Sequence, residues 1–153
     1  MDPRRELIKE TARIFESIIQ KVVITRISPQ DYGTGENLYL GQIHAINAVG
    51  EHPGINITEL SRILGITKGT VSPLVNKLEK KKYLKKTRDA DDGKIVLLEL
   101  THKGRTAKNG FERYRNSLYS DFSKEVTFGQ IAFLNEILSH LEEFLDSKIH
   151  AEP

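Results

Sequence analysis

Apolar residues recur at helical spacing along several stretches of the chain. In residues 4–25 they fall three and four positions apart with polar residues opposite, which predicts an amphipathic helix. Loop-forming residues at 28–35 end that helix, and a second apolar series at 40–49 predicts another helix that ends near Gly50.

The stretch of residues 57–84 divides into two short helices joined by a tight turn. Thr58 is expected to cap the first helix, and Gly65 supplies the permissive backbone that lets the chain leave it. Thr67 is expected to cap the second helix, whose buried stripe is Val71, Leu74, Val75 and Leu78. This arrangement is typical of a helix-turn-helix, whose second helix fits the major groove of DNA, about 12 Å wide.

A β-hairpin is predicted directly after the second helix. Residues 83–88 have strand character, the turn sequence DADDGK follows at 89–94, and residues 95–100 are rich in branched apolar side chains. Helix pair and hairpin together predict a winged helix-turn-helix core over about residues 38–104. The fold class is therefore mainly α with a small β-hairpin wing, an α+β fold.

Three features as a set resemble the MarR family of transcriptional regulators: ITELSRILGITKGTVSPLVNKLEKKKYL at 57–84, DADDGK at 89–94 and LTHKG at 100–104. The resemblance extends over nearly the whole chain. It implies a single domain at 1–153, a homodimer, and a DNA-binding regulator that is a repressor by family default. At the wing tip the chain departs from the family pattern, because Lys94 follows a glycine where relatives usually carry arginine. Lysine lacks the planar fork of arginine, so weaker reading of a narrow minor groove is expected.

The remaining helices are assigned to dimerisation, at about residues 4–25 and 105–149. Thr101 is expected to cap the first helix of the second segment, and Thr127 to open the last helix. The last helix carries an apolar stripe roughly 25 Å long or more, formed by Ile131, Leu134, Ile137, Leu138, Leu141, Phe144, Leu145 and Ile149. Packing within one subunit would also explain this stripe. Its length favours packing between subunits, and the family resemblance implies the same.

Charge is distributed unevenly in a chain whose formal net charge is only +2. A globally basic protein is excluded, so any attraction to nucleic acid must come from local charge. Basic residues crowd the second helix and the wing, at Lys77, Lys80, Lys81, Lys82, Lys85, Lys86, Arg88 and Lys94. In an arbitrary protein such a run is a solvated helix end; its position beside a reading helix and a wing favours nucleic acid here.

A two-fold dimer would present two copies of the second helix about 34 Å apart, which predicts a roughly palindromic operator in double-stranded DNA. Thr67 and Lys68 are expected near phosphates. Thr70, Ser72, Pro73 and Asn76 are the candidates for base edges, because asparagine can pair with adenine and apolar groups can contact a thymine methyl. Further DNA contacts are expected from Lys77, Lys86, Arg88 and Lys94.

Pro73 falls inside the second helix, where proline typically costs about 3 kcal/mol. Either a small kink sets the angle of the helix in the groove, or the first turn, with Gly69 nearby, absorbs the proline. Both explanations stay open at this stage.

The family resemblance also implies a small aromatic or anionic effector that changes the separation of the two reading helices. Such a ligand must bind the two arrangements with different affinity. Candidate pocket residues are Tyr39, His44, Asn47, Phe111, Tyr114, Arg115 and Tyr119. Aromatic residues at helical spacing more often belong to a core, so a packing role competes with this assignment.

Several classes of site are not expected. The absence of cysteine excludes disulfides, thiolate metal sites and thiol-based sensing, and the scattered histidines favour neither a metal nor another cofactor. No nucleophile or acid-base motif favours an enzyme. The charged start and short apolar runs indicate a cytoplasmic protein with no membrane partner.

One rival class remains, a winged-helix protein-interaction module that does not read DNA. Such a module needs an exposed apolar or aromatic face on the second helix, whereas this helix offers threonine, serine, asparagine and lysine.

Overall fold

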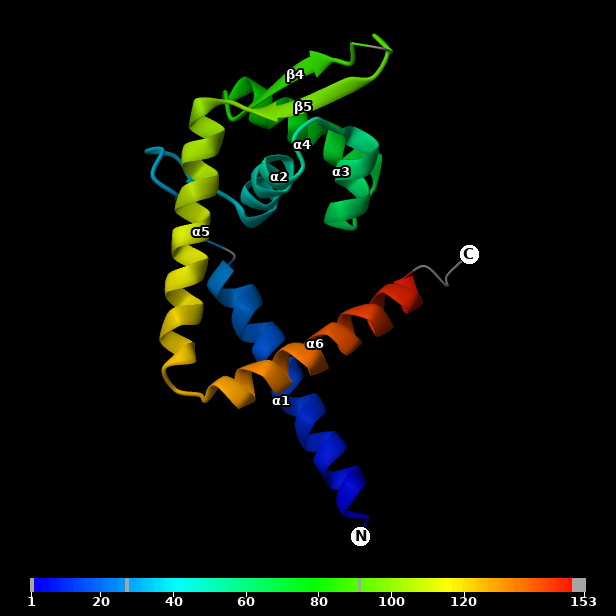
Figure 1. The fold of residues 1–153 in the computed structure, drawn as a ribbon, viewed down its shortest axis with the longest axis vertical. Helices are drawn as coiled ribbons and strands as arrows, with labels where there is room; N and C mark the ends of the chain where they lie inside the picture. Colours follow the sequence, from blue (N-terminus) through cyan, green and yellow to red (C-terminus); the bar gives the residue numbers. More distant parts are fainter. Residues whose placement is uncertain (1, 27, 91, 150–153) are drawn as a thin grey trace. The chain divides into compact units, whose positions relative to one another are not determined.

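A computed structural model describes the backbone of residues 2–26, 28–90 and 92–149, and the side chains of these residues except 22–26 and 149 (Figure 1). The helices are α1 (Pro3–Arg26), α2 (Leu40–Glu51), α3 (Ile57–Leu64), α4 (Lys68–Lys80), α5 (His102–Ser123) and α6 (Phe128–Ile149). The strands are β1 (Gln30–Asp31), β2 (Asn37–Leu38), β3 (Ile55–Asn56), β4 (Leu84–Arg88) and β5 (Val96–Leu100). This mainly helical architecture with a small hairpin confirms the predicted fold class.

The chain divides into two compact units, Met1–Glu112 and Arg113–Pro153, and the boundary falls within α5. The first unit contains the helix-turn-helix, the wing and the start of α5. The second contains the end of α5 and α6. Each unit is described by itself.

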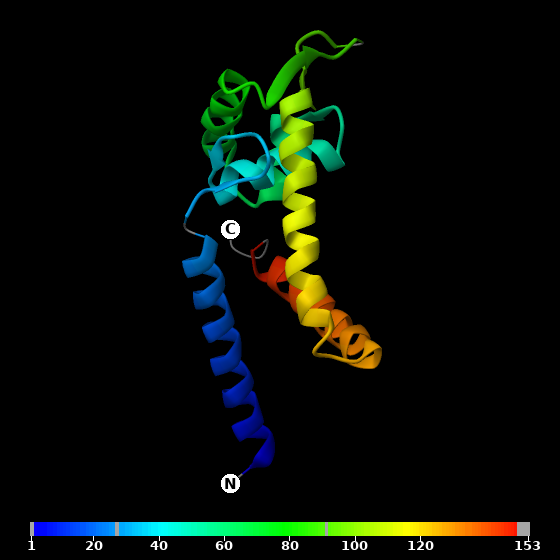
Figure 2. The same cartoon turned by 90° about the vertical axis from the view of Figure 1, so that its left-hand side faces the viewer.

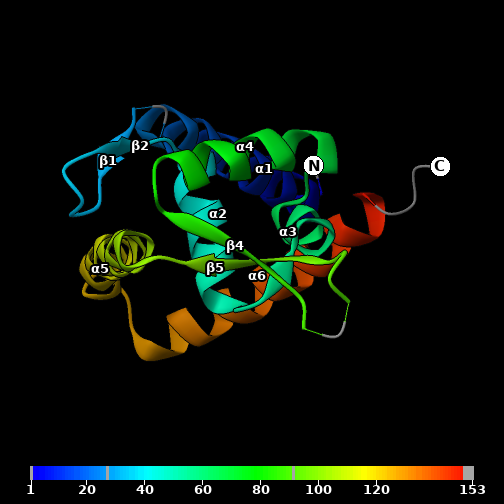
Figure 3. The ribbon, with the colours of Figure 1, turned by 90° about the horizontal axis from the view of Figure 1, so that it is seen from above.

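The winged part of the first unit is built on helices α2, α3 and α4 and on a three-stranded antiparallel sheet in the order β3-β5-β4. The hairpin of β4 and β5 pairs Leu84 with Leu100 and Arg88 with Val96, and its tip extends beyond the helices (Figure 2). Seen from above, α3 lies between α4 and the outer part of the hairpin (Figure 3). Strand β3, which pairs Ile55 with Leu98, was not predicted from the sequence.

One apolar core joins these elements. Its fully buried side chains come from every layer of the winged part, and burial of each large aliphatic side chain contributes about 1.5–3 kcal/mol. They are Leu38, Ile43, Ile46, Val49, Leu60, Val71, Val75, Leu78, Tyr83, Leu84 and Leu98. The helical stripe predicted on α4 is confirmed, with Leu74 only partly buried.

The predicted cap of α3 is wrong by two residues. Asn56, rather than Thr58, caps the helix, because its Oδ1 accepts a hydrogen bond of 3.0 Å from the N–H of Glu59. The Glu59 carboxylate in turn accepts a hydrogen bond of 3.0 Å from the N–H of Asn56, which completes a capping box. The turn after α3 is as predicted, since Gly65 has a φ of +64°.

Thr67 and Thr101 cap their helices as predicted, and Thr127, which was expected to open the last helix, caps it. The Oγ1 of Thr67 accepts a bond of 3.3 Å from the N–H of Thr70 at the start of α4. Thr101 accepts one of 3.1 Å from Gly104 at the start of α5, and Thr127 accepts one of 3.3 Å from Gln130 at the start of α6. Each hydroxyl satisfies an N–H that has no partner inside its helix.

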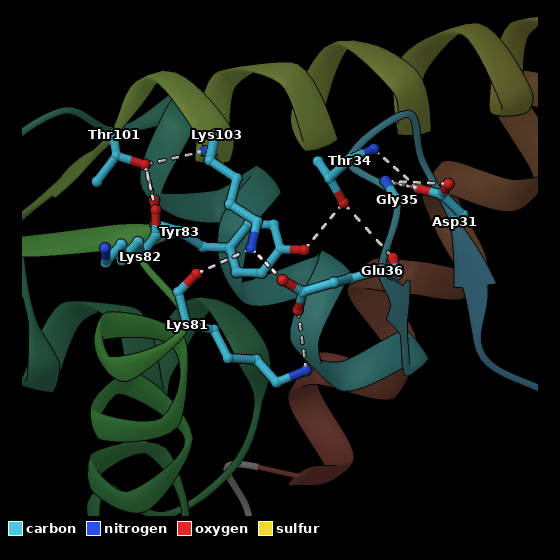
Figure 4. Close-up of polar contacts among 10 residues, drawn as sticks. Asp31, Thr34, Gly35, Glu36, Lys81, Lys82, Tyr83, Thr101 and Lys103 are labelled. Carbon is cyan, nitrogen blue, oxygen red and sulfur yellow. Dashed lines mark hydrogen bonds and ion pairs between the residues drawn. The ribbon is translucent and has the colours of Figure 1, made fainter.

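A polar cluster fastens the loop before α2 to the end of α4 and the start of α5 (Figure 4). The Glu36 carboxylate receives hydrogen bonds from the ammonium groups of Lys81, at 3.3 Å, and of Lys103. The Lys103 ammonium also lies 4.4 Å from the centre of the Tyr83 ring and donates to the Lys81 carbonyl. The Tyr83 hydroxyl pairs with that of Thr34 at 2.9 Å. The C-terminal end of α4 is therefore held by residues distant from it in sequence.

We predict that Glu36→Gln destabilises the fold in a pH-dependent way. The hydrogen bond from Lys103, then that from Lys81, lowers the pKa of Glu36 from its ordinary value of 4.5. A lowered carboxyl pKa contributes stability that is fully present above pH 4.5 and is lost as the pH falls through the lowered pKa. Urea denaturation should therefore show a deficit for Glu36→Gln at pH 7 that disappears in acid.

Glu51→Gln is the matched control for that prediction, because Glu51 is an exposed carboxylate at the end of α2 in the same unit. Its free energy of unfolding should follow that of the wild type across the same pH range. A Glu36→Gln deficit that stayed constant from pH 7 to pH 2 would contradict the ion-pair explanation.

The helices assigned to dimerisation carry exposed apolar side chains. On α6, Phe128 is 88% exposed and Phe133 is 65% exposed, and large apolar residues along α1 and the second half of α5 are exposed as well. The predicted stripe of α6 is present on the helix, except that the side chain of Ile149 lies outside the described residues. Among the described residues, none of the helices combines the length and the apolar character that a membrane span requires.

Candidate nucleic-acid interface

The face of α4 turned away from the core is polar. Burial of Val71, Val75 and Leu78 fixes the rotation of the helix, because residues three and four apart share one face. The predicted DNA contacts Lys68, Thr70, Pro73, Asn76 and Lys77 are all exposed, and Ser72 is half-buried. The fold therefore places on one surface the residues of α4 that the sequence selected.

Hydroxyl groups at the start of α4 form hydrogen bonds within the helix itself. The Thr67 and Thr70 hydroxyls lie 3.0 Å apart, and the Ser72 hydroxyl donates to the Lys68 carbonyl at 2.9 Å. The Ser72 proton is thus engaged within the helix, and its oxygen is left to accept from a partner. Ser72 is the least exposed of the predicted contacts on α4.

Helix α4 continues through Pro73 without a break. Proline has no N–H, so the carbonyl of Gly69, four residues earlier, lacks its helical donor. Space around Gly69 is open, since a Cβ there would find only the Thr67 Oγ1, at 3.7 Å. Pro73 itself is exposed on the outer face.

The wing turn is braced by carboxylates that accept from the backbone. Asp89 accepts a bond of 3.0 Å from the N–H of Asp92, and Asp92 accepts one of 3.0 Å from the N–H of Lys94. Across the hairpin the Arg88 guanidinium donates to the Gly93 carbonyl at 2.9 Å. These bonds fix the backbone that carries the exposed side chain of Lys94; Asp91 lies outside the described residues.

Lys86 does not extend into solvent from the wing. Its ammonium lies 2.6 Å from Asn76 Oδ1 and 2.7 Å from Glu79 Oε2, both on α4. Glu79 was not selected from the sequence, although its position three residues after Asn76 puts the two side chains near each other. The neighbouring Lys85 pairs instead with Glu99, at 2.7 Å, and this bond lowers the pKa of Glu99.

The effector candidates fall into two groups. In the first unit, Phe111 is buried with its ring 5.7 Å from that of His44, Asn47 is buried, and Tyr39 is exposed. Tyr114, Arg115 and Tyr119 belong to the second unit. Among the described residues, Asn47 Oδ1 is a buried side-chain oxygen without a hydrogen-bond partner. The described residues contain no cluster of three or more histidine or acidic side chains that could hold a metal ion.

Two open cavities of the first unit lie away from these candidates. One, of about 470 Å³, is lined by residues of the loop that follows α2, of β3 and of α3, including His52, Glu59 and Arg62. Another, of about 320 Å³, lies between the start of α3 and the wing, beside Asn56, Thr58 and Lys94. Neither is lined by the effector candidates.

Comparison with known proteins gives concordant matches. A family model described as the MarR family matches residues 37–95. The HTH-type transcriptional regulator SarZ of Staphylococcus saprophyticus is 34% identical over 88 residues, which cover 58% of this chain and 60% of that protein. The chain thus aligns with somewhat less than two thirds of the length of the curated relatives it matches.

Solved structures match over more of the chain. Streptococcus pneumoniae FabT in complex with DNA has a TM-score of 0.79 and 26% identity, covering 92% of this chain and 98% of that one. Staphylococcus aureus MarR in complex with salicylate and kanamycin has a TM-score of 0.77, covering 93% and 94%; at 17% identity it shows the fold alone. The family model covers the helix-turn-helix and most of the wing, and the relatives and folds agree with it, so residues 37–95 match the MarR family and the chain resembles its members.

Proposed function

We propose that this protein is a sequence-specific DNA-binding transcriptional regulator, a repressor that binds a roughly palindromic operator as a homodimer. The observation that carries the proposal is the outer face of α4, where exposed polar and cationic residues follow a capped helix start beside a basic wing. The FabT structure contains DNA, and SarZ is named a transcriptional regulator. A protein-interaction module would need an exposed apolar face on α4. Among the described residues, the large exposed apolar side chains lie on other elements.

Dimerisation is supported by the exposed apolar residues of α1 and α6. Many exposed large apolar side chains on one helix are unusual for a monomeric protein and indicate an interface. Two copies of α4 about 34 Å apart would then meet successive turns of one groove. A palindromic operator follows from that symmetry.

Relief of DNA binding by a small aromatic or anionic molecule is the second half of the proposal. Asn47 Oδ1 is buried without a hydrogen-bond partner, about one helical turn from His44 on α2, and a ligand donor would satisfy it. The S. aureus MarR structure contains salicylate. Within the first unit, the candidate pocket residues are Tyr39, His44, Asn47 and Phe111.

The experiment that tests the function is selection of bound fragments from genomic DNA with the purified protein, with and without salicylate. Enrichment of a palindrome that is lost when salicylate is added supports both sequence-specific DNA binding and its relief by a small molecule. Enrichment that salicylate leaves unchanged contradicts relief by this compound. No enrichment even at low salt contradicts DNA reading and favours the interaction module.

We predict that Lys94→Ala weakens binding to all duplexes by a similar factor. Lys94 is an exposed cation on a braced wing tip, and loss of one phosphate contact should reduce the slope of log K against log salt by about one. Fluorescence anisotropy on specific and scrambled duplexes at several salt concentrations measures this slope. Lys124→Ala, which removes an exposed lysine outside the winged part, is the control and should leave the slope unchanged. A Lys94→Ala variant that altered preference at one base pair alone would contradict a phosphate role.

A further inference from the structure

Lys86 links the wing to the reading face of α4. It projects from β4, and its ammonium bonds Asn76 Oδ1 at 2.6 Å and Glu79 Oε2 at 2.7 Å. The side chain of Lys86 is only 28% exposed and that of Glu79 is 40% exposed, so both are partly shielded from water. Asn76 is exposed on the outer face of the helix. The Lys86 ammonium therefore contacts the Asn76 amide from the side of the wing, while the Asn76 side chain is exposed to solvent.

The chemistry of the three groups fixes the orientation of that amide. An ammonium has three donors and no acceptor, so only the oxygen of Asn76 can face it. The amide nitrogen, with its two hydrogens, must then lie on the other side. Glu79 is an acceptor only, and it holds the ammonium from a second direction, which limits rotation of the lysine away from Asn76.

We propose that Lys86 is a positioning residue for DNA recognition, which turns the amide hydrogens of Asn76 toward the base so that this residue selects guanine rather than adenine. This inference rests on the proposed function and deepens it. Asparagine pairs with adenine by offering one acceptor and one donor. Lys86 already donates to the Asn76 oxygen, so the adenine N6 donor would have to share that oxygen with an ammonium whose positive charge disfavours a second donor. Guanine offers two acceptors, O6 and N7, on its major-groove edge, which match the two amide hydrogens. The structure therefore changes the base expected from an asparagine at this position.

The same bonds give Lys86 a role different from that of the exposed lysines. Its charge is paired with Glu79, so its contribution to phosphate attraction is reduced. Lys85, the adjacent residue of β4, is the matched comparison: it is also paired, with Glu99, but it does not bond a residue of α4. Replacing either lysine by an uncharged residue removes one positive charge. Only replacement of Lys86 also removes the bond that orients Asn76.

The test is selection from a random duplex library with the full chain and with four variants. Asn76→Ala identifies the base pair that Asn76 reads, as the position where preference is lost. The wild type should show guanine there, and Lys86→Met should shift the guanine-to-adenine ratio about tenfold toward adenine, within the range of a bidentate base contact. Lys86→Arg, which keeps the donors, should retain guanine, and Lys85→Met should leave the ratio unchanged.

A second measurement needs no variant. Replacing the guanine at that position by 7-deazaguanine removes the N7 acceptor, and the wild type should bind this duplex about fivefold more weakly. Any one of four results would overturn the inference. The wild type could select adenine at this position, or no position could respond to Asn76→Ala. A folded Lys86→Met variant could keep the wild-type guanine-to-adenine ratio, or the wild type could bind the 7-deazaguanine duplex as tightly as the guanine duplex. Those results leave the proposed function intact, whereas a wild type that enriches no duplex overturns the proposed function together with the inference.

Discussion

Leu138→Asp on α6 is expected to abolish the homodimer and to weaken binding to a full operator by about 100-fold or more. Loss of the dimer converts two linked half-site contacts into one, and linkage of this kind typically contributes 10²–10⁴-fold, by order of magnitude. Leu138 is 48% exposed within the described chain, so the substitution places no charge in the core of the subunit. In the proposed dimer it would bury two carboxylates, one from each copy, against apolar side chains, which is strongly unfavourable. Sedimentation velocity and fluorescence anisotropy measure the two effects.

Ser147→Asp is the matched control for Leu138→Asp. It adds the same charge to the same helix nine residues later, which is half a turn away in orientation and therefore on the opposite face. This variant should remain dimeric and bind the operator within about threefold of the wild type, as expected for a surface substitution. A Leu138→Asp protein that stayed dimeric and bound with wild-type affinity would contradict an interface on this stripe.

The features predicted correctly from sequence are those set by residues close together in the chain. The stripe on α4, the threonine caps and the turn at Gly65 each follow from side chains within about one or two helical turns of one another. The cap of α3 was also a local signal. Asn56 followed three residues later by Glu59 is the capping-box pattern, which points to Asn56 rather than Thr58 as the cap.

The features missed depend on contacts between distant residues. Strand β3 has two residues, too few for periodicity to reveal, and it forms because Ile55 reaches Leu98 on β5. Glu36 bonds Lys81 and Lys103, which lie 45 and 67 positions further along. The bond from Lys86 to Asn76 requires the rotation of α4 and the register of the hairpin together. At the site, therefore, the exposed residues of α4 could be predicted from the sequence, whereas the orientation of Asn76 required the structure.

Gly104→Ala is expected to lower the free energy of unfolding by about 3 kcal/mol, the upper part of the usual range for overpacking. A Cβ on Gly104 would overlap the carbonyl oxygen of Tyr83, and the Cδ2 of Leu100 lies 3.2 Å away on another side. The Tyr83 carbonyl has no room to move, because it accepts bonds from both the N–H and the hydroxyl of Thr101, and the Tyr83 side chain is fully buried. Urea denaturation followed by circular dichroism measures the loss.

Gly41→Ala on α2 separates this steric effect from the general effect of adding a methyl group to a helical glycine. No atom lies within 4 Å of the position that a Cβ of residue 41 would occupy, so this variant should gain about 0.5–1 kcal/mol from its higher helix propensity. Opposite signs for the two substitutions are expected because the start of α5 contacts the backbone that leads from α4 into β4. Equal and small effects would contradict close packing of α5 against the Tyr83 carbonyl.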